Sequence, residues 1–320
     1  MQVIWLAFNQ SRFVVHRRLG AGAHGDVFVG FDAYQKREVV IKLAVAPSPP
    51  AENEVRVYNM LSSADGIAEL IWSGIEHGYH ALVLEYLSPD LATVRDICNM
   101  TMEPALVACV GYYMLERLEF VHSRGFIHGD VKPSNFAGVS YVSRQQIIYL
   151  LDFGLADRYM HDGVHIEEGL EPISTRCTPS FASINVLRTF KHSRRDDLES
   201  LIYTFLYLLR SPEGLPWDEL VVILPLFDDV WEGYAWLADI KASSTPHYLF
   251  QGFPEEFAHM LEYVRNLHFD ETPDYQRLKD LCLSILEKAD IQKLELKFEK
   301  WQGAELSVGV AGNKMGGIAH

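Results

Sequence analysis

The sequence has few cysteines and a deficit of positive charge. Its four cysteines, at positions 98, 109, 177 and 282, show no CxxC spacing, which is typical of free thiols in a reducing compartment. We therefore expect a cytoplasmic protein, with a nuclear location as an alternative. Lys and Arg total 28 against 43 Asp and Glu, which gives a net charge of −15. This balance argues against nonspecific nucleic-acid binding, which needs a basic surface, and against attraction to anionic membranes.

Long apolar runs are also absent from the sequence. Residues 1–8 are apolar but too short to span a membrane. They lack the basic start and small-residue cleavage site of a signal peptide, so we expect them to pack on the first lobe. With 320 residues and 48% hydrophobic side chains, the chain can form substantial cores and two lobes. We find no internal repeats and expect a monomer.

The most specific motif lies in the middle of the chain. Residues 128–135 read His-Gly-Asp-Val-Lys-Pro-Ser-Asn, and Asp-Phe-Gly follows at 152–154. Asp, Asn and Pro are common in turns, but this many specified positions indicate the catalytic core of a protein kinase. Phosphoryl transfer needs a carboxylate to orient the attacking hydroxyl, oxygen ligands for Mg²⁺ and positive charge near the phosphate. The predicted carboxylate is Asp130, the predicted cation is Lys132, and the predicted metal ligands are Asn135 and Asp152.

A glycine-rich segment precedes this motif, as the order of a kinase requires. Residues 19–27 read Leu-Gly-Ala-Gly-Ala-His-Gly-Asp-Val. The three glycines alone are a weak signal, because a dinucleotide-binding turn has the same spacing. That turn opens a helix, whereas apolar runs at 13–15 and 27–29 flank this one and predict a hairpin. The predicted contacts to the ATP phosphates are Leu19, Gly20, Gly22, Gly25 and Val27.

A lysine on the next predicted strand completes the nucleotide site. Residues 39–43 are Val-Val-Ile-Lys-Leu, and Lys42 is expected to hold the α- and β-phosphates. A lone lysine near a strand end is usually solvated, so this prediction depends on the glycine segment before it. Its carboxylate partner is expected on the helix that follows. Glu54 lies one turn before Val57 on the inward side, whereas Glu52 is expected in the solvated first turn.

Hydrophobic patterning divides the chain into a β-rich and a helical part. Residues 1–87, ending with an apolar strand at 81–87, form the predicted N-lobe, with strands and one key helix. Residues 88–289 form a mainly helical C-lobe, with helices expected from Pro104, Asp197, Pro254 and Tyr275. Residues 290–320 are a C-terminal extension, helical and then flexible. The predicted fold class is therefore α+β, as in a two-lobed protein kinase.

Several motifs in the second half are more specific than the kinase signature. They are Ser-Ile-Asn at 183–185, Ser-Arg-Arg-Asp-Asp-Leu-Glu-Ser at 193–200, Leu-Pro-Trp at 215–217, Gly-Phe-Pro-Glu-Glu-Phe at 252–257, and residues 267–275. Over residues 12–288 the chain resembles the casein kinase 1 superfamily, which includes the tau-tubulin and vaccinia-related kinases. The resemblance implies a kinase that phosphorylates Ser or Thr of protein substrates with MgATP.

The resemblance also assigns roles to further residues. The backbone of Glu85 and Leu87 is expected to bind adenine, with Leu84 at the back of the pocket. Thr178 is expected to contact Asp130 and Lys132. Asp197 is expected to brace the catalytic loop from below.

Three departures from the family bear on substrate choice. The family's usual Arg before the catalytic Asp is Gly129, as in the vaccinia-related branch, so switching by an activation-loop phosphate is not expected. Ser180 replaces an Arg that binds acidic or phosphorylated substrates. The apolar and acidic segment 223–229 replaces a basic run. Arg188, Lys191, Arg194 and Arg195 are candidate substitutes, although a charge run is usually a solvated face.

Two alternatives to an active protein kinase remain. A pseudokinase acting as a binding module is supported by Cys177, where the family has Gly, and by Ser180. A small-molecule kinase of the aminoglycoside or choline type shares the catalytic loop. It lacks the segments at 183–185 and 193–200, which argues against it.

Overall fold

A computed structural model describes residues 6–22, 25–62, 64–87, 89–98, 102–138, 148–171 and 177–289. Three predictions lie wholly or partly outside these ranges: the packing of residues 1–5, the tip of the glycine-rich segment at 23–24, and the C-terminal extension 290–320. The chain divides into two compact units. The first contains residues 1–87 and 139–156, and the second contains residues 88–138 and 157–320.

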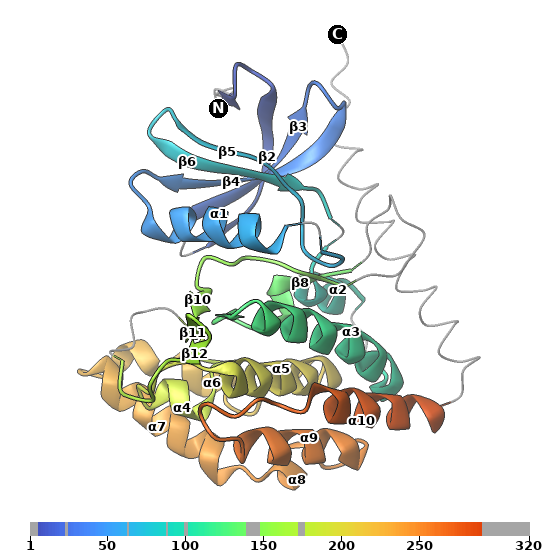
Figure 1. Ribbon diagram of the computed structural model, residues 1–320. Coiled ribbons are helices and arrows are strands. Elements are labelled where there is room, and N and C mark those ends of the chain that lie inside the picture. The colour runs from blue at the N-terminus through green and yellow to red at the C-terminus, as the bar shows by residue number, and fades with distance from the viewer. Residues whose placement is uncertain are drawn as a thin grey trace. The chain divides into compact units, whose positions relative to one another are not determined.

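An antiparallel sheet forms the body of the first unit (Figure 1). Its strand order is β1-β2-β3-β4-β6-β5. The strands are β1 (Ala7–Phe8), β2 (Phe13–Gly22), β3 (Gly25–Asp32), β4 (Arg37–Val45), β5 (Leu70–Glu76) and β6 (Tyr79–Glu85). The glycine-rich segment is a hairpin as predicted, because β2 pairs with β3 from Phe13↔Asp32 to Gly22↔Gly25. Alternating side chains of β4, at Val39, Ile41 and Leu43, enter the core of the unit.

Helix α1 (Pro49–Leu61) packs on strands β5 and β6. It begins where the Ser48 side chain accepts a hydrogen bond from the Ala51 N–H, and two prolines occupy its first turn. The segment 139–156, predicted as part of the C-lobe, clusters with this unit instead. The reason is a tertiary contact, because the Leu150 N–H donates to the Gly66 carbonyl oxygen at 2.9 Å. β9 (Tyr149–Leu150) lies in this segment.

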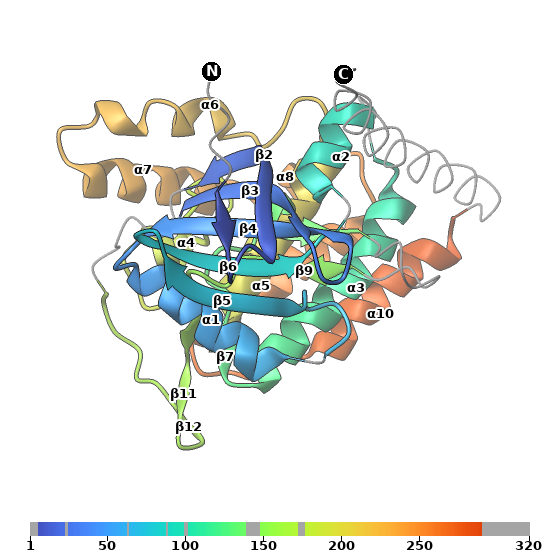
Figure 2. The same ribbon diagram turned by 90° about the horizontal axis from the view of Figure 1, so that it is seen from above.

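The second unit is built around helix α5 (Arg194–Leu209), which is buried along nearly its whole length. It packs against α3 (Pro104–Ser123), α4 (Ile184–Leu187) and α9 (Glu255–Arg265). The other elements are α2 (Leu91–Cys98), α6 (Asp218–Val221), α7 (Val230–Ser243), α8 (Pro246–Leu249), α10 (Tyr275–Glu287), η1 (Pro133–Asn135), η2 (Leu224–Leu226), β7 (Phe126–Ile127), β8 (Phe136–Ala137), β10 (Asp157–Arg158), β11 (Met160–His161) and β12 (Val164–His165). Figure 2 shows α6 and α7 side by side at one end of this unit.

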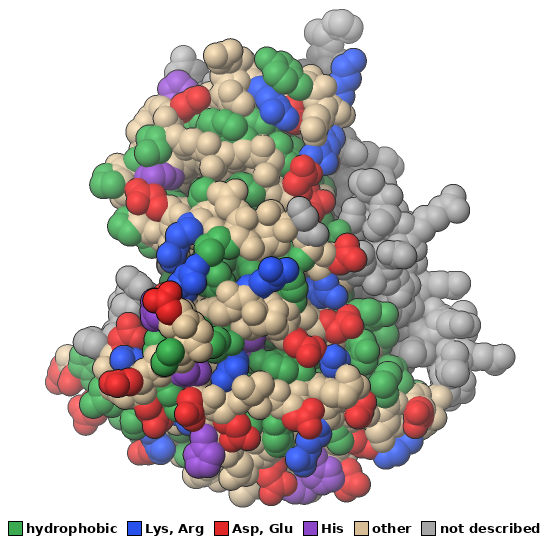
Figure 3. All heavy atoms as spheres, in the orientation of Figure 1, with side chains coloured by type: hydrophobic (Ala, Val, Ile, Leu, Met, Phe, Trp, Pro, Cys, Tyr) green, Lys and Arg blue, Asp and Glu red, His purple; other side chains and the backbone are tan. Residues whose placement is uncertain are grey.

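Capping explains where the predicted helices begin. Helix α5 starts at Arg194 and not at Asp197, because the Asp196 side chain accepts a hydrogen bond from the backbone N–H of Ser193 at 2.8 Å. Helix α9 starts after Pro254, and α10 starts where the Asp274 side chain accepts from the Arg277 N–H at 2.9 Å. Acidic side chains are spread over the face of the helical unit seen in Figure 3, in line with the net charge of −15. None of the helices within the described ranges is long and apolar enough to cross a bilayer.

Candidate active site

In the first unit, Lys42 lies between two carboxylates. Its Nζ is 2.7 Å from Glu54 Oε2 and 2.7 Å from Asp152 Oδ1. The sheet places Lys42 on β4, and α1 turns Glu54 inward with Ala51, Val57 and Tyr58. Glu52 lies in the first turn of α1 with its side chain 59% exposed, and it faces His80. The structure thus brings together Lys42, Glu54 and Asp152 and leaves Glu52 outside this group.

Burial and pairing act in opposite directions on this group. Burial lowers the pKa of Lys42, but the charges of Glu54 and Asp152 hold that pKa above its ordinary value. Burial raises the pKa of Glu54 to about 7, and the charge of Lys42 opposes this rise. Lys42 therefore stays protonated and is held in place by two acidic side chains.

The Asp-Phe-Gly segment is held in an unusual backbone conformation. Asp152 has a φ of 59°, in the left-handed region that L-residues seldom adopt. The next residue, Phe153, is fully buried, and its ring meets the Tyr58 ring edge-on at 5.0 Å. The Gly154 N–H donates to Asp152 Oδ1 at 3.3 Å. Packing of Phe153 against Tyr58 of α1 thus holds Asp152 in a strained backbone conformation, with its carboxylate beside Lys42.

The glycines of the β2–β3 hairpin differ in what they do. A Cβ on Gly25, whose φ is +135°, would lie 2.2 Å from the Leu43 carbonyl oxygen, so packing within the sheet requires this glycine. Among the residues that the structure describes, none comes within 4 Å of a Cβ placed on Gly20. The fold therefore leaves Gly20 open to a ligand. Gly22 is the last residue of β2, Val27 lies on β3, and Leu19 is 46% exposed.

The residues predicted to bind adenine lie at the end of β6. Leu84 is buried, and Glu85 is the last residue of the strand. The Glu85 N–H donates to the Glu69 carbonyl oxygen at 3.1 Å, so any adenine contact made by Glu85 must use its carbonyl oxygen. Leu87 follows two residues later and is buried.

In the second unit, three side chains of the predicted site form one hydrogen-bonded group. Thr178 Oγ1 donates to Asp130 Oδ1 at 2.7 Å. Lys132 Nζ donates to Asp130 Oδ2 at 2.6 Å and to Thr178 Oγ1 at 3.0 Å. Asn135 Nδ2 donates to the Asp130 carbonyl oxygen at 2.7 Å, so a metal ion would be bound through Oδ1 of Asn135. This group holds a carboxylate and a cation within reach of an attacking hydroxyl.

Asp197 braces the segment before Asp130. Its carboxylate accepts hydrogen bonds from the backbone N–H of His128 at 2.6 Å and of Gly129 at 2.9 Å. His122 Nε2, 2.8 Å away, is a partner that sequence analysis missed. Burial raises the pKa of Asp197, but the bond to His122 and the charges of nearby histidines lower it overall to about 2. Asp197 therefore stays ionised over the physiological range.

The departure at position 129 has a backbone explanation. Gly129 has a φ of +80°, a conformation that costs an L-residue about 1–2 kcal/mol. Glycine meets this requirement without strain while its N–H bonds to Asp197. A glycine in place of an Arg at this position is thus compatible with an intact loop.

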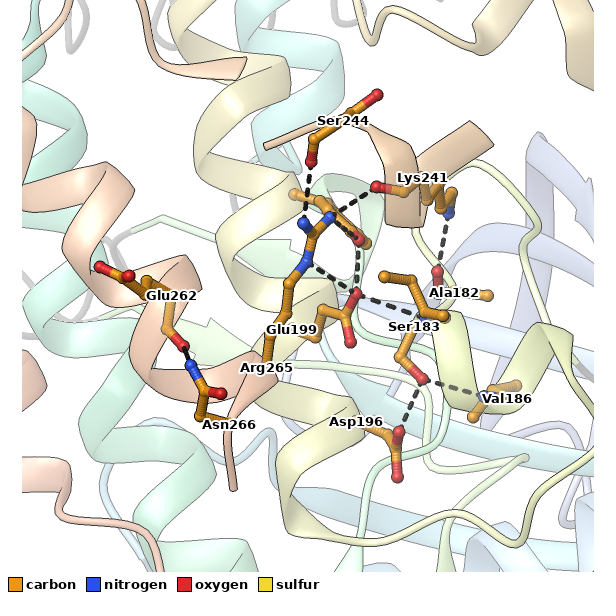
Figure 4. A network of polar contacts seen from close by, with 12 residues as sticks. Ala182, Ser183, Val186, Asp196, Glu199, Lys241, Ser244, Glu262, Arg265 and Asn266 are labelled. Atoms are coloured by element: carbon orange, nitrogen blue, oxygen red, sulfur yellow. Dashed lines mark hydrogen bonds and ion pairs between the residues drawn. The ribbon is translucent and has the colours of Figure 1, made fainter. Parts of the chain in front are cut away.

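Lys241, which sequence analysis did not single out, and Trp217, the last residue of the Leu-Pro-Trp motif, hold the segment after Thr178. Lys241 Nζ donates to the carbonyl oxygens of Pro179 at 2.8 Å, Ser180 at 3.0 Å and Ala182 at 2.7 Å. Figure 4 shows its contact with Ala182. Trp217 Nε1 also donates to the Ser180 carbonyl oxygen, at 2.7 Å. Lys241 was missed because a single lysine belongs to no motif, whereas Trp217 belongs to the Leu-Pro-Trp motif but its bond to Ser180 was not predicted.

The basic residues offered as substitutes for the family's anion site have other partners. Arg188 pairs with Asp239, Lys191 bonds to the Glu167 carbonyl oxygen, Arg194 to the Asp270 carbonyl oxygen and Arg195 to Glu168. Arg194 departs from the expected solvated face. It is buried, because its guanidinium lies 4.7 Å from the centre of the Tyr159 ring. These contacts argue against a ready-made anion site at these four residues.

The predicted metal ligands, Asn135 and Asp152, belong to different units. Within the described ranges there is no cluster of three or more His, Cys, Asp or Glu that suits a metal ion. Mg²⁺ commonly takes one or two protein oxygens and fills its remaining positions with water and phosphate. An amide and a carboxylate are suitable oxygen donors, so the residue types fit this ion.

Comparison with protein families gives a match that agrees with the site residues. Residues 13–217 match the model of the protein kinase domain. The matched range contains the β2–β3 hairpin, Lys42, Glu54, the loop around Asp130 and the Asp-Phe-Gly segment. It ends at Trp217, which bonds to the segment after Thr178.

Proposed function

The chain belongs to the protein kinase family, and we propose that it is an active serine/threonine kinase of the casein kinase 1 type. The observation that carries the proposal is the contact of Lys42 Nζ with both Glu54 and Asp152, each at 2.7 Å. A lysine held by two carboxylates, inside a fold with an open glycine hairpin, suits a protein that binds the phosphates of ATP. Its fold is α+β, with a β-rich N-terminal region and a helical C-terminal region.

The proposed reaction joins the hydroxyl oxygen of a Ser or Thr side chain to the γ-phosphorus of ATP. The bond between that phosphorus and the oxygen of ADP breaks, and the hydroxyl proton leaves. Asp130 orients the hydroxyl and accepts its proton, and Lys132 offsets the charge on the transferred group. Thr178 keeps both side chains in place through its hydroxyl. Lys42 holds the α- and β-phosphates.

Asn135 and Asp152 are the residues that would hold Mg²⁺, which neutralises the charge that develops on the phosphates. Glu54 positions Lys42, and Leu84, Glu85 and Leu87 are the proposed adenine contacts. The Ser/Thr preference and the casein kinase 1 type rest on the motifs at 183–185 and 193–200 and not on the geometry.

A peptide-library assay with MgATP tests the proposal. We expect phosphate on Ser and Thr but not on Tyr, and we expect Asp130→Asn to remove this activity while the protein stays folded. Transfer to Tyr alone would contradict the proposed specificity. ATP binding without transfer to any peptide, by protein that is shown to be folded, would favour the scaffold alternative.

A further inference from the structure

One stretch of the second unit combines acidic side chains with a complete lack of basic ones. Residues 211–240 contain no Lys, Arg or His. They contain seven acidic residues: Glu213, Asp218, Glu219, Asp228, Asp229, Glu232 and Asp239. The stretch includes α6, η2 and the greater part of α7.

The same stretch exposes large apolar side chains. Val222 is 76% exposed and Leu226 is 79% exposed, and Ile223, Val230 and Trp231 are also exposed. Such side chains gathered on one surface indicate an interaction site. We call this surface the apolar–acidic face and define it by these residues: Val222, Ile223, Leu226, Asp228, Asp229, Val230, Trp231 and Glu232.

The apolar–acidic face is supported from within. Leu224 is buried beneath it, and the Phe227 ring packs against the Trp236 ring at 5.5 Å between centres. A Cβ on Gly233 would lie 3.1 Å from the Phe227 ring, so the turn into α7 is tightly packed. The Asp229 side chain accepts from the Trp231 N–H and starts α7. The exposed side chains therefore sit on an ordered scaffold.

Two residues that flank the apolar–acidic face in the sequence, Trp217 and Lys241, are bonded to the segment that follows Thr178. Trp217, just before α6, donates to the Ser180 carbonyl oxygen. Lys241, the first residue after the stretch, donates to the carbonyl oxygens of Pro179, Ser180 and Ala182. These bonds fix the position of the apolar–acidic face relative to Thr178, whose side chain bonds to Asp130. In the space-filling view, hydrophobic and acidic side chains lie together at the lower left, where Figure 1 places α7.

We propose that the apolar–acidic face docks a segment of the protein substrate in which large apolar residues alternate with Lys or Arg. This inference rests on the proposed kinase function. The apolar side chains supply the area that is buried, and the acidic ones select the charge of the partner. In the described part of the chain, neither Asp228 nor Glu232 forms an ion pair with Lys or Arg, so each is available to a cationic partner.

The acidic side chains of the apolar–acidic face also argue against negatively charged partners. A phosphorylated or acidic peptide would meet like charge there, as would a nucleic acid or an anionic membrane. A basic and apolar segment meets opposite charge and a surface that it can bury. Its binding is expected to weaken as salt screens the charges.

A pair of peptides tests the proposal. Both carry the same acceptor serine, and the second also carries an apolar–basic segment joined by a flexible linker. The second peptide is made with several linker lengths and with the segment before or after the serine. With wild-type protein we expect the added segment to raise kcat/KM about tenfold, mainly through a lower KM. That factor corresponds to about 1.4 kcal/mol. The gain should shrink at high salt.

Matched variants test whether the gain in kcat/KM depends on the apolar–acidic face. Val222→Asp and Leu226→Asp should remove the gain while leaving kcat for the short peptide unchanged. Val164→Asp is the control, because Val164 is 69% exposed on β12, away from the apolar–acidic face. A double variant, Asp228→Lys with Glu232→Lys, should transfer the preference to an acidic segment.

The outcomes separate this proposal from the kinase assignment. If the short peptide is phosphorylated but the added segment brings no gain with any linker, the docking proposal is wrong and the kinase function stands. If neither peptide is phosphorylated, the function fails, and binding of the labelled segment, measured by fluorescence anisotropy, then decides on docking. A dimer detected by light scattering and lost in Leu226→Asp would assign the face to a second copy of the chain and overturn the proposal.

Discussion

The Thr178 hydroxyl links the carboxylate of Asp130 to the segment that Lys241 and Trp217 hold. It donates to Asp130 Oδ1 at 2.7 Å and accepts from Lys132 Nζ at 3.0 Å. Hydrogen bonds to charged groups contribute about 1.5–3 kcal/mol each. Thr178→Val should therefore lower kcat for a peptide substrate about tenfold or more, whereas Thr178→Ser should keep most of the activity. Equal kcat values for the two variants, both shown to be folded, would contradict this role.

Asp152→Asn should abolish phosphoryl transfer without unfolding the protein. The substitution keeps the size of the side chain but removes the charge that a hard cation prefers. Lys42 keeps Glu54 as a partner, so the first unit should retain its structure. The measurements are peptide phosphorylation and thermal unfolding. Near wild-type turnover by folded Asp152→Asn protein would show that Asp152 is not a metal ligand.

The Lys42–Glu54 pair should affect turnover more than ATP affinity. Correct placement of the phosphates matters most in the transition state, so Lys42→Met should lower kcat far more than it raises the Kd for ATP. Glu54→Gln should act in the same direction, by about tenfold or more. Glu52→Gln is the matched control, because Glu52 is exposed and faces His80 instead. A larger loss from the Glu52 change than from the Glu54 change would reverse our choice of partner.

Lys241 should make stability depend on pH. Burial lowers its pKa from an ordinary value of 10.5 to about 7, although the charges of Glu199, Cys177 and Asp218 oppose this shift. Arg265 lies nearby and adds to the lowering. Between about pH 7 and pH 10.5 the unfolded chain holds a proton that the folded chain has released. The difference in bound protons makes the free energy of unfolding rise with pH in this window. The stabilisation it contributes is complete above pH 10.5 and is lost as the pH falls towards 7.

Denaturant titrations at several pH values can measure this effect. In Lys241→Met the rise between pH 7 and pH 10 should be absent. The same variant should also be less stable by about 2 kcal/mol at pH 7, because three carbonyl oxygens lose their donor. Identical pH profiles for the two proteins would mean that Lys241 does not titrate in this window.

Phosphorylation of the substrate upstream of the target should bring little advantage. Ser180 supplies no cation, and Arg194 is buried against Tyr159. We expect less than about a tenfold gain in kcat/KM for primed over unprimed peptides, or about 1.4 kcal/mol. Ser180→Arg should increase that gain, since Arg suits the geometry of a phosphate. A strong primed preference in wild type, lost when Arg188, Lys191 and Arg194 are neutralised, would instead establish an anion site there.

The parts of the fold that sequence predicted well are those with a strong local pattern. The β-branched run at 39–43 became β4, and the apolar positions from Leu106 to Val121 became the buried face of α3. Glu54 was distinguished from Glu52 by helical spacing alone, and the structure puts it 2.7 Å from Lys42. In each case the residues that decide the outcome lie within a few turns or one strand of each other.

The parts that were not predicted depend on contacts between distant residues. Helices α6 and α8 are only four residues long, too short for a periodic apolar face to mark them in the sequence. Lys241 gained its role from carbonyl oxygens about 60 positions earlier, which no local pattern reports. Arg194 was expected in a solvated charge run, but tertiary packing against Tyr159 buried it.

Two glycines of the β2–β3 hairpin, Gly20 and Gly25, give different information to anyone comparing this chain with its relatives. Gly25 is required by the Leu43 carbonyl oxygen, so a relative that had lost all catalysis would still keep it in order to fold. Within the described ranges no atom lies within 4 Å of a Cβ placed on Gly20, so the packing of the sheet does not require glycine there. A larger residue at position 20 in a relative would thus be compatible with an intact sheet, whereas a larger residue at position 25 would disturb the packing of the sheet.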